Sequence, residues 1–170
     1  MVGFGDPLNK IDIRYARFTD LWMISSLSGK AFKRYGRYEK TIRRWFLSGN
    51  TVTFVALHSN KKAGFIMVGP IDTCQTASNY PEVLAIAVRP QFQGMGIGRE
   101  LLLKAEEELR DLGIRRLYLH TSVDNLRAQR LFQRMGYRVL RVERVFYDRG
   151  QDAYLMSKDI IETGMEFIIR

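Results

Sequence analysis

Three glycines at alternating positions, Gly94, Gly96 and Gly98, separate an apolar run of residues from an amphipathic one. The apolar run, 82–89, is typical of a central strand, and residues 95–112 have the leucine spacing of a helix. Glycines leave the N–H groups of a turn unshielded, and a helix that begins there directs the positive end of its dipole toward the same point. The segment therefore predicts a binding site for a phosphate or pyrophosphate group.

Two common phosphate-binding loops do not fit this segment. The dinucleotide-binding pattern G-x-G-x-x-G requires a glycine where the chain has Arg99. A P-loop requires Gly-Lys followed by Ser or Thr, whereas the chain reads Gly98-Arg99-Glu100 and offers no hydroxyl group for magnesium. The anion is therefore expected to belong to another kind of cofactor.

The segment Gln93-Gly94-Met95-Gly96-Ile97-Gly98 resembles the Q/R-x-x-G-x-G/A signature that binds the pyrophosphate of coenzyme A in the GNAT superfamily of N-acetyltransferases. The flanking segments 13–17, 124–132 and 135–137 occur in the order of that superfamily. The closing stretch, 146–156, is similar to the end of protein N-terminal (Nα) acetyltransferases. Together these resemblances cover residues 11–159.

The resemblance implies an α/β (α+β) protein with the single-domain GNAT fold, a mixed central sheet flanked by helices. It also implies acetyl-CoA as co-substrate and transfer of an acetyl group to an amine, first of all a protein N-terminal α-amine, by direct attack in a ternary complex. A small-molecule amine and a lysine ε-amine remain alternative acceptors. A non-catalytic regulatory module that binds acyl-CoA remains an alternative of another class.

Acetyl-CoA is expected to lie along the strand 82–89 and across the glycine loop. In the resembled family the pantetheine arm contacts the main chain of this strand, so side-chain identity matters little there. Asn125 matches a family position near the pantetheine, although it would also cap a helix without any ligand. The residues assigned to acetyl-CoA are Ile86, Ala87, Val88, Gln93, Gly94, Met95, Gly96, Ile97, Gly98, Arg99, Asn125 and Phe132.

Two residues are candidates for the general base. His120 ends the expected strand 115–121, beside the expected thioester, at a position similar to the base of some Nα-acetyltransferases. Glu82 begins the strand 82–89 at about the position of the base glutamate in the histone-acetylating branch, and it could act alone, through water or with His120. Deprotonating an α-amine at neutral pH costs about 1 pK unit, or about 1.4 kcal/mol, against about 3.4 units for a lysine. A mild base such as His120 therefore favours an α-amine.

The chain departs from the family at Phe132, seven residues after Asn125. Many members have a tyrosine there, proposed to protonate the departing thiolate, and phenylalanine cannot donate a proton. The thiolate could leave as an anion, or Tyr80, Tyr137 or Tyr147 could supply the proton. The same substitution also favours the non-catalytic alternative.

Substrate recognition is expected from two aromatic segments, 32–38 and 145–147. Phe32, Tyr35 and Tyr147 are the predicted contacts. The first segment also carries three positive charges, which indicate either acidic substrates or a solvated basic end of a helix.

Composition places limits on the remaining functions. The net charge of +9 comes without a long Lys/Arg tract, so a nucleic-acid partner is not expected. No apolar run reaches the ~20 residues that span a bilayer, and no signal-peptide pattern is present, which predicts a cytoplasmic protein. With two histidines and the single Cys74, neither a metal site nor an internal disulfide is expected. A monomer or homodimer, with an association close to the ribosome, is the expected assembly.

The chain length of 170 residues suits one domain, 11–159, between extensions at 1–10 and 160–170. Thr19 or Asp20 is expected to cap the first helix, and Leu112 to lie on the buried face of the helix 95–112. Apolar periodicity predicts a strand, two helices, three strands, a helix, a strand, a helix and two strands. Their expected ranges are 11–17, 19–47 for the helix pair, 51–58, 63–68, 82–89, 95–112, 115–121, 124–135, 137–145 and 153–158.

Overall fold

The computed structural model describes residues 10–70 and 80–160. Its elements follow the predicted order, with two short 3-10 helices added, η2 (Phe18–Asp20) and η3 (Pro90–Phe92). Cys74 and most of the two expected extensions lie outside the described residues. The strands and α-helices are β1 (Ile11–Tyr15), α1 (Leu21–Ala31), α2 (Tyr38–Leu47), β2 (Val52–His58), β3 (Lys61–Gly69), β4 (Glu82–Val88), α3 (Ile97–Asp111), β5 (Arg116–Ser122), α4 (Leu126–Arg134), β6 (Arg138–Glu143) and β7 (Ala153–Asp159).

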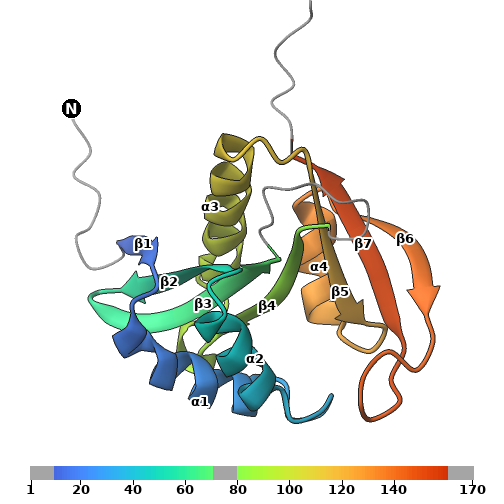
Figure 1. The fold of residues 1–170 in the computed structure, drawn as a ribbon, viewed down its shortest axis with the longest axis horizontal. Coiled ribbons are helices and arrows are strands. Elements are labelled where there is room, and N and C mark those ends of the chain that lie inside the picture. The colour runs from blue at the N-terminus through green and yellow to red at the C-terminus, as the bar shows by residue number, and fades with distance from the viewer. Residues whose placement is uncertain (1–9, 71–79, 161–170) are drawn as a thin grey trace, which may run out of the picture.

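A seven-stranded mixed sheet with the order β1-β2-β3-β4-β5-β7-β6 forms the centre of the molecule (Figure 1). Side chains alternate between its faces, because successive residues of a strand point in opposite directions. Phe54 and Ile66 pack with α3 and α4 on one face, whereas Val55 and Phe65 pack with α1 and α2 on the other. Helices therefore cover both faces of the sheet, as the sequence predicted.

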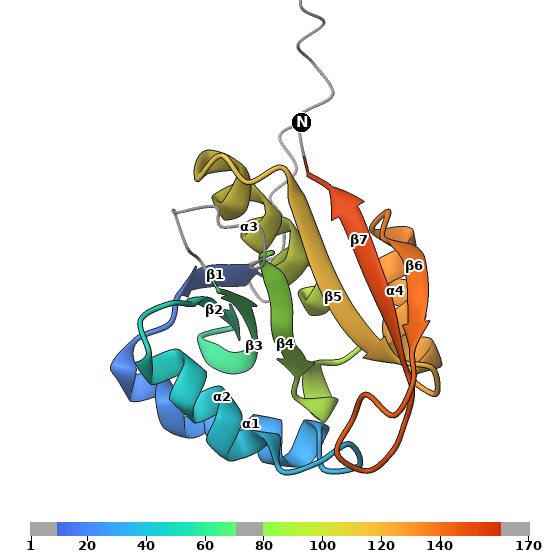
Figure 2. The ribbon, with the colours of Figure 1, turned by 45° about the vertical axis from the view of Figure 1, so that its right-hand side comes forward.

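The sheet divides between β4 and β5, its only parallel pair among the described strands. These strands pair only through Glu82 with Tyr118 and Val83 with Leu119. Beyond these pairs they separate toward the glycine loop, as Figure 2 shows. The β4 edge that faces β5 therefore keeps unpaired main-chain groups from Leu84 to Val88, although residues 85–88 pair with β3 on the other edge.

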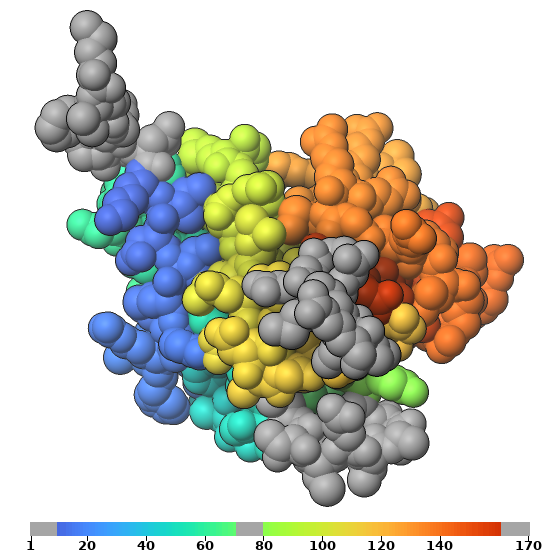
Figure 3. All heavy atoms as spheres, turned by 90° about the horizontal axis from the view of Figure 1, so that it is seen from above, coloured from blue at the N-terminus to red at the C-terminus, as the bar shows by residue number. Residues whose placement is uncertain are grey.

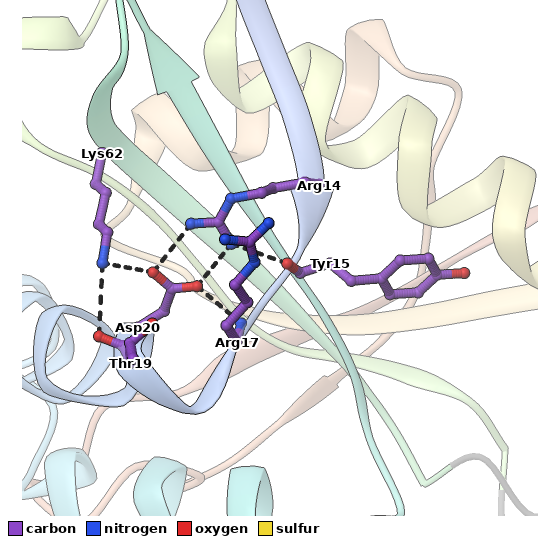
Figure 4. A network of polar contacts seen from close by, with 6 residues as sticks. All are labelled: Arg14, Tyr15, Arg17, Thr19, Asp20 and Lys62. Atoms are coloured by element: carbon purple, nitrogen blue, oxygen red, sulfur yellow. Dashed lines mark hydrogen bonds and ion pairs between the residues drawn. The ribbon is translucent and has the colours of Figure 1, made fainter.

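A buried carboxylate fixes the start of α1 (Figure 4). Asp20 occupies the N-cap position, as predicted, but its side chain makes no capping hydrogen bond to α1. Its oxygens accept hydrogen bonds from the Arg14 side chain at 2.7 Å and the Arg17 N–H at 2.8 Å, and the Lys62 ammonium lies 2.6 Å away. Burial alone would raise the pKa of Asp20, but these cationic and N–H donors hold it well below its usual range. The network ties β1 and α1 to the β2–β3 hairpin.

The two faces of α3 depart from the prediction at two residues. Leu112, expected on the buried face, is exposed because α3 ends at Asp111 and Leu112 is its C-cap. Glu106, expected among the solvated charges, is buried, where it accepts a hydrogen bond from the Tyr137 hydroxyl at 3.1 Å and pairs with the Lys158 ammonium at 2.6 Å. Gly113 follows with φ +78°, as expected at a helix C-terminus.

Candidate active site

A cavity of about 110 Å³ lies where β4 and β5 separate. Its walls come from both strands, from α4 and from the two segments expected to recognise the substrate. These walls include His120, Asn125 and Phe132, so candidates for catalysis and for cofactor binding share one cavity. The aromatic side of the cavity consists of Phe32, Tyr35, Tyr38 and Tyr147.

His120 is held between two carboxylates. Its Nδ1 lies 2.6 Å from Glu82 Oε1, and its Nε2 lies 3.1 Å from Glu143 Oε2. The ring of Phe146 stacks on the imidazole, with ring centres 4.1 Å apart and an angle of 15° between the rings. We call Glu82, His120 and Glu143 the histidine clamp.

Sheet register explains how residues so far apart in sequence meet. Glu82 pairs with Tyr118 across the parallel β4–β5 junction, which places it near His120, two residues further along β5. On the other side, His120 pairs with Leu155 of β7, which in turn pairs with Arg141 of β6. Glu143 lies two residues beyond Arg141 on β6 and therefore reaches the same face of the sheet.

The clamp favours the imidazolium form of His120. Burial of the ring opposes protonation, but the hydrogen bonds and charges of Glu82 and Glu143 outweigh it, so the pKa of His120 is raised. Burial likewise acts to raise the pKa of Glu143, but Arg141, which donates a 2.7 Å hydrogen bond, and His120 lower it. With His120 protonated, each ring N–H donates to one carboxylate, and the clamp together with Arg141 is about neutral; with His120 neutral, as a base must be, the same group carries a net charge of about −1.

Glu143 was not predicted from the sequence. It lies within the run 137–145, which was interpreted only as one strand of the last β pair, and it is the last residue of β6. Its contact with His120 depends on β7 lying between β5 and β6 in the sheet. The only signal in the sequence was a carboxylate at the end of an otherwise exposed strand.

The glycine loop has the backbone that the phosphate-site prediction requires. Gly94 and Gly96 have φ values of +84° and +79°, and a Cβ atom on either would meet no atom within 4 Å, so open space surrounds both. Gly96 is the N-cap of α3, and no side chain of the described residues caps that helix. The N–H groups of its first turn therefore remain available to an anion.

Residues around the loop fix its shape. The Gln93 side chain donates to the Val88 carbonyl at 2.9 Å and accepts a hydrogen bond from Arg127, so its polar atoms support the loop from within. A Cβ atom at Gly98 would approach Leu131 to 3.2 Å, which shows how closely α3 and α4 pack there. In Figure 3 the yellow-green residues at the start of α3 accordingly lie beside the orange residues of α4. Arg127 adds positive charge beside this loop, whereas the charge of the exposed Arg99 is paired with Glu100 at 2.6 Å.

The remaining cofactor candidates divide into main-chain and side-chain positions. Ile86, Ala87 and Val88 lie on the open edge of β4, where an extended ligand could pair with their main-chain groups. Asn125 caps α4, and its Oδ1 accepts a 3.1 Å hydrogen bond from the Ala128 N–H. The predicted capping role of Asn125 is confirmed. Met95 and Ile97 differ in exposure, since Met95 is exposed on the loop and Ile97 is buried in the core.

Only one of the three alternative tyrosines lines the cavity. Phe132 is buried there and has no proton to donate. The Tyr137 hydroxyl is engaged with Glu106, and Tyr80 lies on the surface against Tyr118. Tyr147 lines the cavity, where burial raises the pKa of its hydroxyl. It is therefore the candidate donor with the best position among the three.

The two aromatic segments are tied together at the cavity. The ring centres of Tyr35 and Tyr147 are 4.8 Å apart, and the Gln151 side chain donates to the Arg34 carbonyl at 2.7 Å. Tyr38, at the start of α2, packs edge-on against Tyr147. The structure thus brings the three predicted contacts, Phe32, Tyr35 and Tyr147, to one side of the cavity.

Two further properties concern the described residues only. No helix among them is long and apolar enough to cross a membrane. No group of three or more His, Cys, Asp or Glu side chains in this part of the chain is placed to hold a metal ion.

Comparison with known proteins agrees with this geometry. The family model described as "Acetyltransferase (GNAT) family" matches residues 16–137. An N-alpha-acetyltransferase of Sulfurisphaera tokodaii is 28% identical over 152 residues, which cover 85% of this chain and 90% of that protein. The structure of Arabidopsis thaliana NAA60 in complex with acetyl-CoA has a TM-score of 0.75 at 22% identity and covers 89% of this chain and 99% of its own. The ribosomal-protein-S18-alanine N-acetyltransferase of Escherichia coli has a TM-score of 0.70 at 24% identity, with coverage of 92% and 98%. These two structural similarities concern the fold.

Proposed function

Because the chain belongs to the GNAT family of N-acetyltransferases, we propose that its acceptor is a protein N-terminal α-amine and that acetyl-CoA is its donor. One observation carries the choice of acceptor. The histidine clamp and the tied aromatic segments adjoin a cavity of only about 110 Å³. Sites that enclose a whole drug-sized ligand measure about 300–1,000 Å³. The cavity suits an amine with one side chain, while the rest of a polypeptide acceptor stays outside.

The glycine loop and the open edge of β4 fit acetyl-CoA. The pyrophosphate suits the N–H groups around Gly94 to Arg99, and the pantetheine arm suits the main chain of Ile86, Ala87 and Val88. Asn125 and Phe132 line the cavity beside this edge. Acetyl-CoA supplies the acetyl group as an activated thioester, so this chain has to place the amine and remove its proton.

The histidine clamp suits both tasks. Its net negative charge attracts an N-terminal ammonium group into a half-buried site. The pKa of His120 is raised, which is the direction of the α-amine's pKa of about 8, and each unit of mismatch removed saves about 1.4 kcal/mol in the proton transfer. Neutral His120 takes the first proton from the ammonium, directly or through Glu82, which frees the nitrogen lone pair. The amine nitrogen then bonds to the acetyl carbon, the thioester C–S bond breaks, and the second proton of that nitrogen goes to the departing thiolate, which leaves as the thiol of coenzyme A. Glu143 holds the imidazole and stabilises the imidazolium that results.

The acceptor can be tested with two forms of one peptide that contains an internal lysine. One form has a free α-amine, and the other has that amine blocked by an acetyl group. We expect thiol release and a mass increase of one acetyl group only with the free form. Faster acetylation of the lysine in the blocked form would contradict the α-amine assignment. Binding of acetyl-CoA without turnover on any peptide of a diverse panel would support the non-catalytic alternative instead.

A further inference from the structure

Six exposed basic residues form a strip beside the cavity. Three lie in the segment between α1 and α2, and three lie on the outer face of α2, where Lys40, Arg43 and Arg44 share one side of the helix because residues three and four apart are neighbours. Ile42, on the opposite side of α2, is 1% exposed and belongs to the core. The basic strip consists of Lys33, Arg34, Arg37, Lys40, Arg43 and Arg44.

The charge of the basic strip is hardly compensated by the protein itself. Between residues 32 and 47 the chain has one acidic residue, Glu39, against these six cations. Arg34 pairs with Asp124 at 3.8 Å, and both side chains are more than half exposed. The other five have no carboxylate oxygen within 4.0 Å among the described residues. Other surface cations of the described residues are also unpaired, but no separate stretch of the described residues 10–70 gathers so many of them around a single carboxylate.

The basic strip continues directly from the cavity wall. Phe32, Tyr35 and Tyr38 line the cavity, and the basic residues alternate with them in sequence. A shallow hollow over α2 is lined by Lys40, Arg43 and Arg44 together with Leu47 and Ser48. Figure 2 shows the segment between α1 and α2 reaching the loop between β6 and β7. Because Phe32, Tyr35 and Tyr38 line the cavity, the basic residues between them lie beside it.

The charges of the histidine clamp and of the basic strip would orient a bound polypeptide. The negative histidine clamp receives the N-terminal ammonium, and the positive strip begins where the following residues leave the cavity. The ten residues of α2 span about 15 Å, which an extended chain covers with about five residues. The strip thus faces the residues that follow the first two or three of the acceptor.

From this juxtaposition we infer that the basic strip binds acidic side chains a few residues after the acetylated N-terminus, so that the enzyme selects proteins with an acidic N-terminal segment. The inference rests on the proposed function, since it requires a polypeptide acceptor. A nucleic acid would fit the charge alone, but it has no counterpart in the clamp and the aromatic cavity that adjoin the strip.

The test uses two peptides that share their first three residues and differ at positions 4–8, which are either acidic or neutral. Exposed ion pairs are worth about 0.2–1 kcal/mol, or roughly 1.5- to 5-fold in affinity each. With two or three such contacts, KM for the acidic peptide should be about tenfold lower than for the neutral peptide at low salt. The preference should largely disappear at about 0.5 M salt, because exposed charges are screened.

Arg43→Glu/Arg44→Glu is the informative variant, because both residues lie on the far part of the strip and away from the cavity. We expect it to raise KM for the acidic peptide by fivefold or more and to leave kcat and the neutral peptide within twofold. Arg110→Glu/Arg115→Glu makes the same change of charge near the end of α3 that lies opposite α2 in Figure 1, and it should leave the preference intact.

Equal KM values for the two peptides in the wild type would overturn the inference, as would an equal effect of the α2 variant on both. Retention of the preference at high salt would also contradict it. The strip would instead be assigned to nucleic acid if an RNA oligonucleotide bound the wild type but not the α2 variant, while the α2 substitutions left the peptide preference unchanged. Failure of the proposed function would look different, because the neutral peptide would then not be acetylated at all.

Discussion

Replacing Glu143 by glutamine tests whether the histidine clamp sets the pKa of His120. The substitution keeps the size of the side chain and removes its negative charge from Nε2, 3.1 Å away. The side chain of Glu143 is 26% exposed and that of His120 is 13% exposed, so the contact lies between an exposed ion pair and a buried charged hydrogen bond. Such contacts are worth about 0.2–1 and about 1.5–3 kcal/mol respectively. A loss of about 1 kcal/mol corresponds to a fall of roughly 0.7 unit in the pKa of His120.

The sign follows from which form the carboxylate stabilises. Glu143 favours the imidazolium, so its removal must lower the pKa of His120 and make the neutral base available at lower pH. The low-pH limb of kcat should therefore move to lower pH by about 0.5–1 unit, while maximal kcat falls because the imidazolium formed in the reaction loses a partner. Glu82→Gln should shift the pKa of His120 further, since its contact is shorter, at 2.6 Å.

The measurement is a proton NMR titration of the imidazole signals. The chain has only two histidines, so His120→Ala assigns the signal and His58 serves as the internal reference. Arg141→Gln is the matched control, because it changes the 65% exposed partner of Glu143 without removing the carboxylate, and it should leave the pKa of His120 the same or slightly higher. An unchanged or raised pKa of His120 in Glu143→Gln would refute the reasoning.

Three further predictions concern the base, the cofactor loop and the fold. His120→Ala should lower kcat by about 10²-fold while calorimetry shows acetyl-CoA affinity near that of the wild type; a loss below threefold would make His120 a structural residue and shift attention to Glu82. Asparagine and aspartate both tolerate the positive φ of Gly96, but only aspartate adds a negative charge at the start of α3. Calorimetry should therefore show that acetyl-CoA binds about tenfold more weakly to Gly96→Asp than to Gly96→Asn. Equal affinities of the two variants would contradict the anion site. Asp20→Asn should lower the free energy of unfolding at pH 7 by about 3 kcal/mol or more, because it leaves Arg14 and Lys62 without their buried partner. The pKa of Asp20 is lowered in the folded state, whereas in the unfolded chain it is about 4. Denaturant titrations should therefore show the full difference in unfolding free energy between wild type and Asp20→Asn well above pH 4, and a shrinking difference as the pH falls below about 4. A constant difference down to about pH 2 would contradict the assignment.

Features that depend on neighbouring residues were predictable from the sequence. The glycine loop is one, because the positive φ values of Gly94 and Gly96 and the start of α3 are set within a few residues. The cap of α4 by Asn125 is another. The order of the elements followed for the same reason, since apolar periodicity is a local signal.

Features that depend on sheet order were not predictable. The contact between Glu143 and His120 exists because β7 inserts between β5 and β6, and no local pattern specifies that arrangement. The sequence argument also treated His120 as an ordinary mild base, whereas the clamp raises its pKa. Asp20 shows the same limit. It is the N-cap residue of α1, as expected, but the sequence did not indicate that its side chain would lie in a network that reaches Lys62 on β3.

The separation of β4 from β5 has a mechanical consequence. Among the described strands, β1 to β4 and the group β5, β7 and β6 are joined across the sheet by two residue pairs only, Glu82 with Tyr118 and Val83 with Leu119. A ligand that forms hydrogen bonds along the open edge of β4 would fill the gap between β4 and β5 and so connect the two halves of the sheet. We therefore expect cofactor binding to make the two halves of the sheet unfold as one unit, and to slow amide hydrogen exchange in β4 and β5 well away from the atoms that react.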